Sequence, residues 1–411
     1  MTTPSSAIAF PAAAKKHALE ALYRWIQAAC AALLLGLAAA LFGLGSSHYI
    51  AFAFAGAFLV HVAMRPSRRE VALTVACAVI FGLAYHLLCA DMSSYYGAAV
   101  AIPGAFLGLG SLLVVTLRRL WAADAAKRLR LEQAREVFLI PVLCVCSTAA
   151  LSVARAFTPI TYDRLVYAFD LKFGGPPSWA IGQLLRSHPW MLQTCGYAYY
   201  SLPLGLAAFV ALHGKDRQLG TRITVDLRLL CVALGLVGFL LYQVCPVAGP
   251  IYLFGNAFPS RVPDLAGFAI QPAWLAPADR NGMPSLHVGW MLLLFWNVRR
   301  RSWWMGAIAA IDLVLTAVAT LGFGEHYLMD LIVAPALALA MQAACTRTGS
   351  AVRWAALATG TAITLAWLMA FRTGVALRIP AGAAAWSMAL VSVALPVFAA
   401  WRLERAADRS A

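Results

Sequence analysis

The stretch MPSLHVGWMLLLFWNV (residues 283–298) places two polar side chains, Ser285 and His287, at the start of an apolar run. Similar apolar blocks recur along the chain, and each is close to the length that a helix needs to cross about 30 Å of hydrocarbon. Of the 411 residues, 62% are hydrophobic and 12% are charged, which excludes an ordinary soluble domain. The sequence therefore predicts an all-α integral membrane protein.

The apolar blocks predict about twelve transmembrane helices. The basic segment 118–137 is the longest connection on its side, and its mixture of leucine, tryptophan and charge predicts an amphipathic interfacial helix. It separates four N-terminal spans from the rest. The predicted spans are residues 26–44, 48–64, 71–90, 97–117, 138–157, 191–212, 226–245, 284–298, 303–322, 327–345, 354–371 and 384–401.

The net charge of +15 is distributed unevenly between the loops. Alternate loops hold 24 of the 32 lysines and arginines, so the positive-inside rule places both termini in the cytoplasm. A basic face of this kind fits anionic lipid, and no nucleic-acid partner is expected. The long loops 158–190 and 246–283 then lie on the opposite side. The alanine-rich chain with short loops favours a bacterial inner membrane, with those loops in the periplasm.

A second polar cluster, GEHYLMD (324–330), opens the tenth predicted span on the same side as Ser285 and His287. Residues four apart share one helix face, so the Asp330 carboxylate can accept a hydrogen bond from His326. This bond would orient the imidazole and make its other nitrogen a better nucleophile or base. His287 could approach from another helix as a proton donor. Two histidines and one carboxylate suit attack on a phosphate ester.

The same region offers groups that could hold the phosphate. Ser285 and the backbone amides from Gly282 onward lie at a helix start, where N–H groups attract anions. Arg280 and Arg261 lie in the preceding loop and could form a guanidinium clamp. The cysteines show no metal-ligand spacing, and neither a metal nor a cofactor is expected. The alternative is that Pro-Ser serves only as a helix cap and His326 only as an interfacial hydrogen-bonding group.

These motifs resemble those of a known family. PSLH followed by HYLMD is similar to the second and third signature motifs of the type 2 phosphatidic acid phosphatase superfamily. The form of the motifs is closer to the branch that contains fungal inositol phosphorylceramide synthase, and YQVCPVAGPIY (242–252) resembles that branch's first motif. The resemblance implies a six-helix catalytic core over 138–345. An N-terminal four-helix region (1–137) would precede this core, and a two-helix region (346–411) would follow it.

By this resemblance, His326 would be the nucleophile that forms a phosphohistidine, Asp330 its orienting acid, and His287 the proton donor. The widespread first motif, Lys-x6-Arg-Pro, is absent, and Ala319-Thr320 replace the usual Ser-Arg before His326. Two phosphate-binding cations are therefore missing. Their possible substitutes are Arg261, Arg280, Lys172 and Arg164.

The expected function is that of a lipid enzyme. It would transfer or remove a phosphate-bearing head group on a phospholipid or sphingolipid within the bilayer, on the non-cytoplasmic face. A plain phosphatidate or polyprenyl phosphate phosphatase is the alternative. A twelve-helix transporter is disfavoured, because transporters place ionisable groups near the midplane and here these groups cluster at one surface. The sequence does not indicate an oligomeric state.

Overall fold

The chain folds almost entirely into helices. Within the described ranges there is one two-stranded sheet, in which β1 (Ile160–Thr161) runs antiparallel to β2 (Ala273–Trp274). The expected all-α class is confirmed. The computed structural model describes residues 20–32, 48–88, 98–218, 224–264, 266, 269–275, 278–347 and 350–409.

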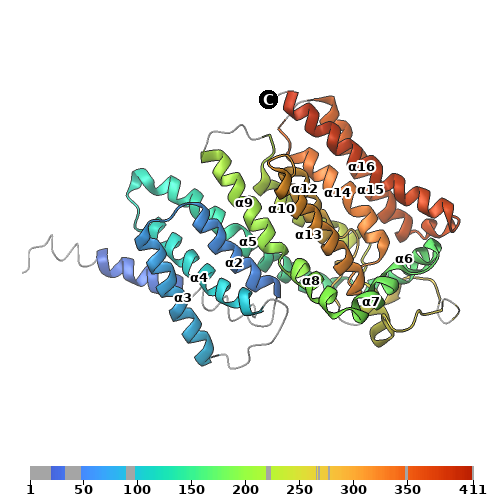
Figure 1. Cartoon of the computed structure of the whole chain (residues 1–411), viewed down its shortest axis with the longest axis horizontal. Coiled ribbons are helices and arrows are strands. Elements are labelled where there is room, and N and C mark those ends of the chain that lie inside the picture. The colour runs from blue at the N-terminus through green and yellow to red at the C-terminus, as the bar shows by residue number, and fades with distance from the viewer. Residues whose placement is uncertain are drawn as a thin grey trace, which may run out of the picture.

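The N-terminal helices form a group at one side of the molecule (Figure 1). The separate interfacial helix predicted over 118–137 does not form, because α4 continues to Leu120 and α5 runs unbroken from Asp124 to Phe157. Strong helix formers fill the start of α5, so the basic segment continues directly into the apolar part. The group contains helical residues 20–32, α2 (His48–Ala63), α3 (Arg68–Leu88), α4 (Ala98–Leu120) and α5 (Asp124–Phe157).

The long loop predicted over 158–190 is largely helical. It contains α6 (Asp163–Asp170), η1 (Leu171–Phe173) and α7 (Pro177–Ser187). Next come α8 (Pro189–Tyr200) and α9 (Leu202–Gln218), which meet at an angle of 46°. The single straight span predicted over 191–212 is therefore a bent pair. Both α7 and α8 begin with proline, whose fixed φ suits a first helical turn.

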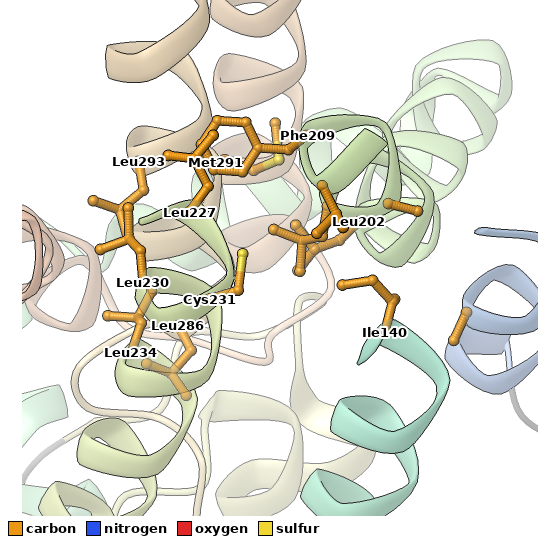
Figure 2. Packing of buried hydrophobic residues seen from close by; sticks show 14 of the residues in the cluster. Ile140, Leu202, Phe209, Leu227, Leu230, Cys231, Leu234, Leu286, Met291 and Leu293 are labelled. Carbon is orange, nitrogen blue, oxygen red and sulfur yellow. The ribbon is translucent and has the colours of Figure 1, made fainter. Parts of the chain in front are cut away.

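The central helices surround α14, which packs against α10, α12, α15 and α16. Figure 2 shows the apolar contact between α10, α12 and the neighbouring α9 and α5. The central elements are α10 (Leu227–Val244), α11 (Pro250–Phe254), η2 (Gly255–Ala257), α12 (Leu286–Val298), α13 (Trp303–Gly322) and α14 (Leu328–Cys345). The C-terminal elements are α15 (Ala351–Arg372), η4 (Val375–Arg378) and α16 (Ala383–Arg409).

Small residues allow the helices around α14 to approach closely. A Cβ atom added to Gly360 of α15 would lie 2.5 Å from the carbonyl oxygen of Ala336 on α14. Lipid tails are as apolar as leucine, so helices in a bilayer associate mainly through close packing of this kind. At Gly360, α15 therefore lies too close to α14 for any larger side chain.

Eight described helices are long and apolar enough to cross a membrane, and the bent pair α8 and α9 makes a ninth if it is one span. Two shorter apolar helices, α2 and α12, accompany them. These helices support an integral membrane protein. The first predicted span, 26–44, lies largely outside the described residues. The count of twelve spans and the six-helix core stay predictions.

Helix α12 runs between two chemically different ends of the bundle. It starts directly after Ser285, at what we call the site end. It stops before three consecutive arginines, at what we call the basic end. There Arg299 Nη2 lies 2.6 Å from Glu404 Oε2, Arg300 Nη1 lies 2.6 Å from Asp408 Oδ2, and Arg301 pairs with Asp216.

Candidate active site

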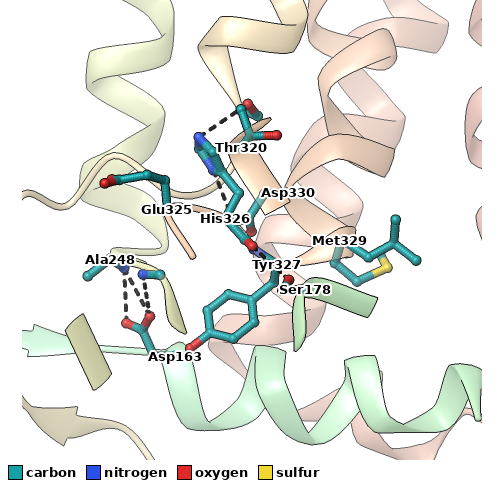
Figure 3. Close-up of polar contacts among 12 residues, drawn as sticks. Asp163, Ser178, Ala248, Thr320, Glu325, His326, Tyr327, Met329 and Asp330 are labelled. Carbon is teal, nitrogen blue, oxygen red and sulfur yellow. Dashed lines mark hydrogen bonds and ion pairs between the residues drawn. The ribbon is translucent and has the colours of Figure 1, made fainter. Parts of the chain in front are cut away.

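His326 lies in the turn between α13 and α14, where Asp330 orients it (Figure 3). Its Nδ1 atom is 3.3 Å from Asp330 Oδ2, and the same oxygen accepts the Tyr327 N–H at 2.9 Å. Asp330 therefore caps the first turn of α14 while it holds the imidazole. His326 itself precedes the helix, so the capped turn, and not a shared helix face, brings the two side chains together.

The hydrogen bonds around His326 leave one ring nitrogen with a lone pair. An ionised carboxylate only accepts hydrogen bonds, so Nδ1 carries the proton and Nε2 does not. Ser285 Oγ lies 3.3 Å from Nε2 and donates to it, while the Ser285 N–H donates to the main-chain oxygen of Asp330 at 3.0 Å. His326 is only 1% exposed and Ser285 is fully buried. A phosphate must displace the serine hydroxyl to reach Nε2.

His287, on the first turn of α12, lies beside His326 with a ring-centroid separation of 6.2 Å. One face of its ring stacks on Tyr199 of α8 at 4.3 Å and 17°. Its Nε2 atom is 2.9 Å from the hydroxyl of Tyr49, at the start of α2. The second histidine is thus held between residues from two distant parts of the chain.

Two residues of the 158–190 segment hold the backbone around His326. The Asp170 carboxylate accepts the N–H groups of Leu328 at 2.8 Å and Met329 at 3.4 Å, at the start of α14. A carboxylate is stabilising there because the helix dipole is positive at its N-terminus. Ser178 Oγ donates to the His326 carbonyl at 2.9 Å. Burial raises the pKa of Asp170 well above its usual range, against the lowering effect of the Leu328 N–H bond.

The segment that resembles a first motif packs directly against the His326 turn. Asp163 accepts the N–H groups of Ala248 at 3.0 Å and Gly249 at 2.8 Å. Gly249 has φ +125°, and a Cβ atom there would lie 2.4 Å from the Glu325 carbonyl oxygen, so only glycine fits. Burial raises the pKa of Asp163, although these N–H bonds lower it. Asp163 thus connects the first-motif segment to the site.

Glu325, the neighbour of His326, faces a tyrosine. The Tyr252 hydroxyl donates to its carboxylate at 3.0 Å. Burial raises the pKa of Glu325, while the Tyr252 bond and the nearby His326 lower it. Burial also raises the pKa of Tyr252, and the Glu325 charge adds to the shift. Neither group brings positive charge to the surroundings of His326.

The residues predicted to bind phosphate from the 246–283 loop have other contacts. Arg280 is buried, and its guanidinium donates to the carbonyl oxygens of Ala278 at 2.7 Å, Thr158 at 3.0 Å, Leu275 at 3.1 Å and Pro159 at 3.4 Å. Arg261 is exposed, and its carbonyl accepts the indole N–H of Trp179 at 2.9 Å. The Gly282 N–H donates to Val247 O at 2.7 Å. These contacts organise the loop, and they leave little of the Arg280 guanidinium for a phosphate.

The other two candidate cations also bind backbone carbonyls. Lys172 Nζ donates to Leu377 O at 3.0 Å and to Ile379 O at 2.7 Å, which ties η1 to the C-terminal helices. Arg164 Nη1 donates to Ala269 O at 3.3 Å. The structure therefore brings together His326, Asp330, Ser285 and His287, while these cations hold loops around them. Within the described ranges, no three His, Cys, Asp or Glu residues are grouped to hold a metal ion.

Sequence reasoning missed Tyr49, Asp163, Asp170 and Ser178. The last three of these residues lie in the 158–190 segment, where no motif singles them out. Nothing in the sequence placed Tyr49 near His287, from which it is 238 residues away.

Residues 164–344 match the family model of the PAP2 superfamily. The match indicates a lipid-phosphatase-type enzyme, and it agrees with the broader resemblance of the motifs. It runs from α6 to α14 and so includes His287, Ser285, His326 and Asp330, but not Tyr49. A search of curated proteins and a search of solved structures each gave no match.

Proposed function

We propose that the protein is a membrane-embedded lipid phosphoester enzyme that works through a phosphohistidine on His326. The observation that carries the proposal is the buried series of hydrogen bonds from Asp330 through His326 to Ser285. An orienting acid on one nitrogen and a lone pair on the other are what a histidine nucleophile needs. His287, whose ring centre is 6.2 Å from that of His326, is near enough to act as acid and base across a bound phosphate.

The chemistry has two steps. In the first, Nε2 of His326 attacks phosphorus, the bond to the lipid alcohol oxygen breaks, and His287 gives that oxygen a proton. In the second, water or an acceptor alcohol attacks the phosphohistidine, gives its proton to His287, and frees His326. Water as acceptor makes the enzyme a phosphatase, whereas an alcohol makes it a head-group transferase.

The burial of the site favours transfer. With His326 only 1% exposed, few waters reach a phosphohistidine, which would survive until an alcohol arrives. This supports movement of a phosphate-bearing head group between lipids, of the kind that the inositol phosphorylceramide synthase branch carries out. Hydrolysis of phosphatidate or a polyprenyl phosphate is the second candidate. The basic residues at the opposite end of α12 support a site on the non-cytoplasmic, periplasmic face.

The test uses purified protein in lipid nanodiscs with radiolabelled lipid phosphates and phospholipids, with and without an alcohol acceptor. We expect a protein-bound label that is stable in alkali and lost in acid, followed by a new labelled lipid. If the label appears only as free phosphate, the protein is a phosphatase and not a transferase. Failure of every ester to label the protein or to turn over would overturn the proposal.

A further inference from the structure

The candidate site contains a side chain from outside the family-matched segment. Tyr49 opens α2, whereas the match begins at residue 164. Its hydroxyl is 2.9 Å from His287 Nε2, and its ring centre is 5.4 Å from that of His287. Edge contacts to Tyr199 at 5.8 Å and to Tyr200 at 5.4 Å hold the Tyr49 ring in place.

The packing of α2 holds Tyr49 in position against His287. α2 packs along α4, α5 and α9, and Ile50, next to Tyr49, is fully buried. The position of the hydroxyl is therefore set by a helix and not by a flexible loop. Stacking on Tyr199 fixes the plane of the His287 ring, and the Tyr49 hydroxyl fixes its rotation within that plane.

With Nε2 engaged, Nδ1 is the nitrogen left for proton transfer. When His287 is the imidazolium, the Tyr49 oxygen accepts from Nε2–H, and Nδ1–H is free for the departing oxygen. After that transfer Tyr49 still accepts from Nε2–H, and Nδ1 has the lone pair that takes the proton of the incoming water or alcohol. One hydrogen bond thus serves both steps.

We infer that Tyr49 is a positioning residue for His287, so that the N-terminal helical group is part of the active site and not only a membrane anchor. The inference rests on the proposed function for its catalytic consequence. The hydrogen bond itself can be tested without turnover.

The first test compares Tyr49→Phe with Tyr197→Phe. Both changes remove one hydroxyl, but Tyr197 is 49% exposed on α8, outside the histidine cluster. Each variant is assayed with an alkyl phosphate lipid, a poor leaving group, and with a nitrophenyl phosphate ester, a good one. We expect Tyr49→Phe to lower kcat for the alkyl ester by about tenfold, the worth of one hydrogen bond, and to affect the nitrophenyl ester far less. Tyr197→Phe should match the wild type on both.

A structural role alone would lower both rates equally, and that outcome, like no change at all, would overturn the inference. A double-mutant cycle adds a check: in a His287→Gln background, Tyr49→Phe should cause no further loss. If the wild type turns over neither ester, it is the proposed function that fails.

The second test needs no substrate. Diethyl pyrocarbonate modifies unprotonated imidazole nitrogens, and mass spectrometry measures its rate at each histidine. In the wild type the Tyr49 oxygen keeps the proton on Nε2 of His287. Without that oxygen the ring can take the other tautomer, with a lone pair on Nε2, so His287 should be modified several-fold faster in Tyr49→Phe than in the wild type. The exposed His188 is the internal reference and should react equally in both. Equal modification rates of His287 in the wild type and in Tyr49→Phe would show that this hydrogen bond is absent, and they would overturn the inference.

Discussion

At the site end of the bundle three aspartates are held by backbone N–H groups, whereas at the basic end Glu404 and Asp408 are held by arginine side chains. Asp163, Asp170 and Asp330 each accept at least one main-chain N–H. Glu404 and Asp408 instead pair with Arg299 and Arg300. Backbone anchoring fixes the position of a turn, while paired long side chains tolerate small shifts. The comparison indicates that the turns of the site end are held more firmly than the helix ends of the basic end, and we propose that the basic end sets the orientation in the membrane.

The largest expected effect is all-or-none labelling that separates the two ends. Single cysteines replace Gln271, in the loop of the site end, and Lys215, near the end of α9, in a background without the nine native cysteines. Both positions are exposed. Because the positive-inside rule places the basic end in the cytoplasm, an impermeant thiol reagent should label only Gln271→Cys in intact cells.

Opening the membrane should then expose Lys215→Cys. The reverse pattern would invert the topology and put the candidate site on the cytoplasmic face, with substrates drawn from the inner leaflet.

The next effect is catalytic. His326→Ala should lower turnover by at least about a thousandfold, because it removes the atom that attacks phosphorus. The matched change His188→Ala, at an exposed histidine outside the cluster, should leave turnover unchanged. Assays of lipid phosphate turnover and thermal midpoints for both proteins make the comparison. Retained activity in a folded His326→Ala protein would reject the mechanism.

The sequence predicted the parts of the site that local spacing determines. The four-residue interval from His326 to Asp330 predicted their hydrogen bond, although the bond forms through a capped turn and not along a helix face. The Pro-Ser pair predicted the start of α12. Contacts between distant segments could not be predicted in this way. Tyr49 meets His287, and Asp170 meets Leu328, only because whole helices pack as they do.

Arg280 is a second example of a contact that the sequence could not predict. A loop position near the motif suggested that Arg280 binds phosphate, but the folded loop surrounds it with four backbone carbonyls. A sequence shows that a cation is near a site in the chain. It does not show whether unpaired carbonyls compete for that cation. The helical spans were easier to place because twenty apolar residues allow few other structures in a membrane.

A smaller effect on stability should follow Asp170→Asn, which leaves one acceptor oxygen and one NH2 group where two carboxylate oxygens accept the Leu328 and Met329 N–H groups. We expect a loss of about 1–3 kcal/mol, measured as the thermal midpoint in detergent, together with reduced turnover as the His326 turn loosens. Asp408→Asn at the basic end is the matched control and should have little effect, because that residue is half exposed. If Asp170→Asn and Asp408→Asn lowered the thermal midpoint equally, the difference between the site end and the basic end would be rejected.

The pH dependence of the Asp170 variant has a definite sign. Burial raises the folded-state pKa of Asp170 above its unfolded value. The wild type therefore has the full stabilisation from this group at low pH and loses it as pH rises through the folded pKa. Asparagine does not titrate, so the gap in thermal midpoint between wild type and Asp170→Asn should narrow as pH increases. A gap that widens would contradict the raised pKa.

The smallest effects are expected within the basic end itself, where two neighbouring arginines differ in burial. The Arg300–Asp408 pair is 55% and 49% exposed, and exposed pairs of this kind contribute about 0–1 kcal/mol. The Arg299–Glu404 pair is 26% and 13% exposed, so Arg299→Ala leaves a mostly buried carboxylate without its donor and should cost about 1–3 kcal/mol. Thermal midpoints at low and high salt measure both variants, and only the Arg300→Ala difference should vanish at high salt. Neither change should alter turnover, because both lie at the far end of α12 from His326. A loss of activity in either variant with an unchanged thermal midpoint would show that the basic end communicates with the chemistry, and the division between the two ends would have to be abandoned.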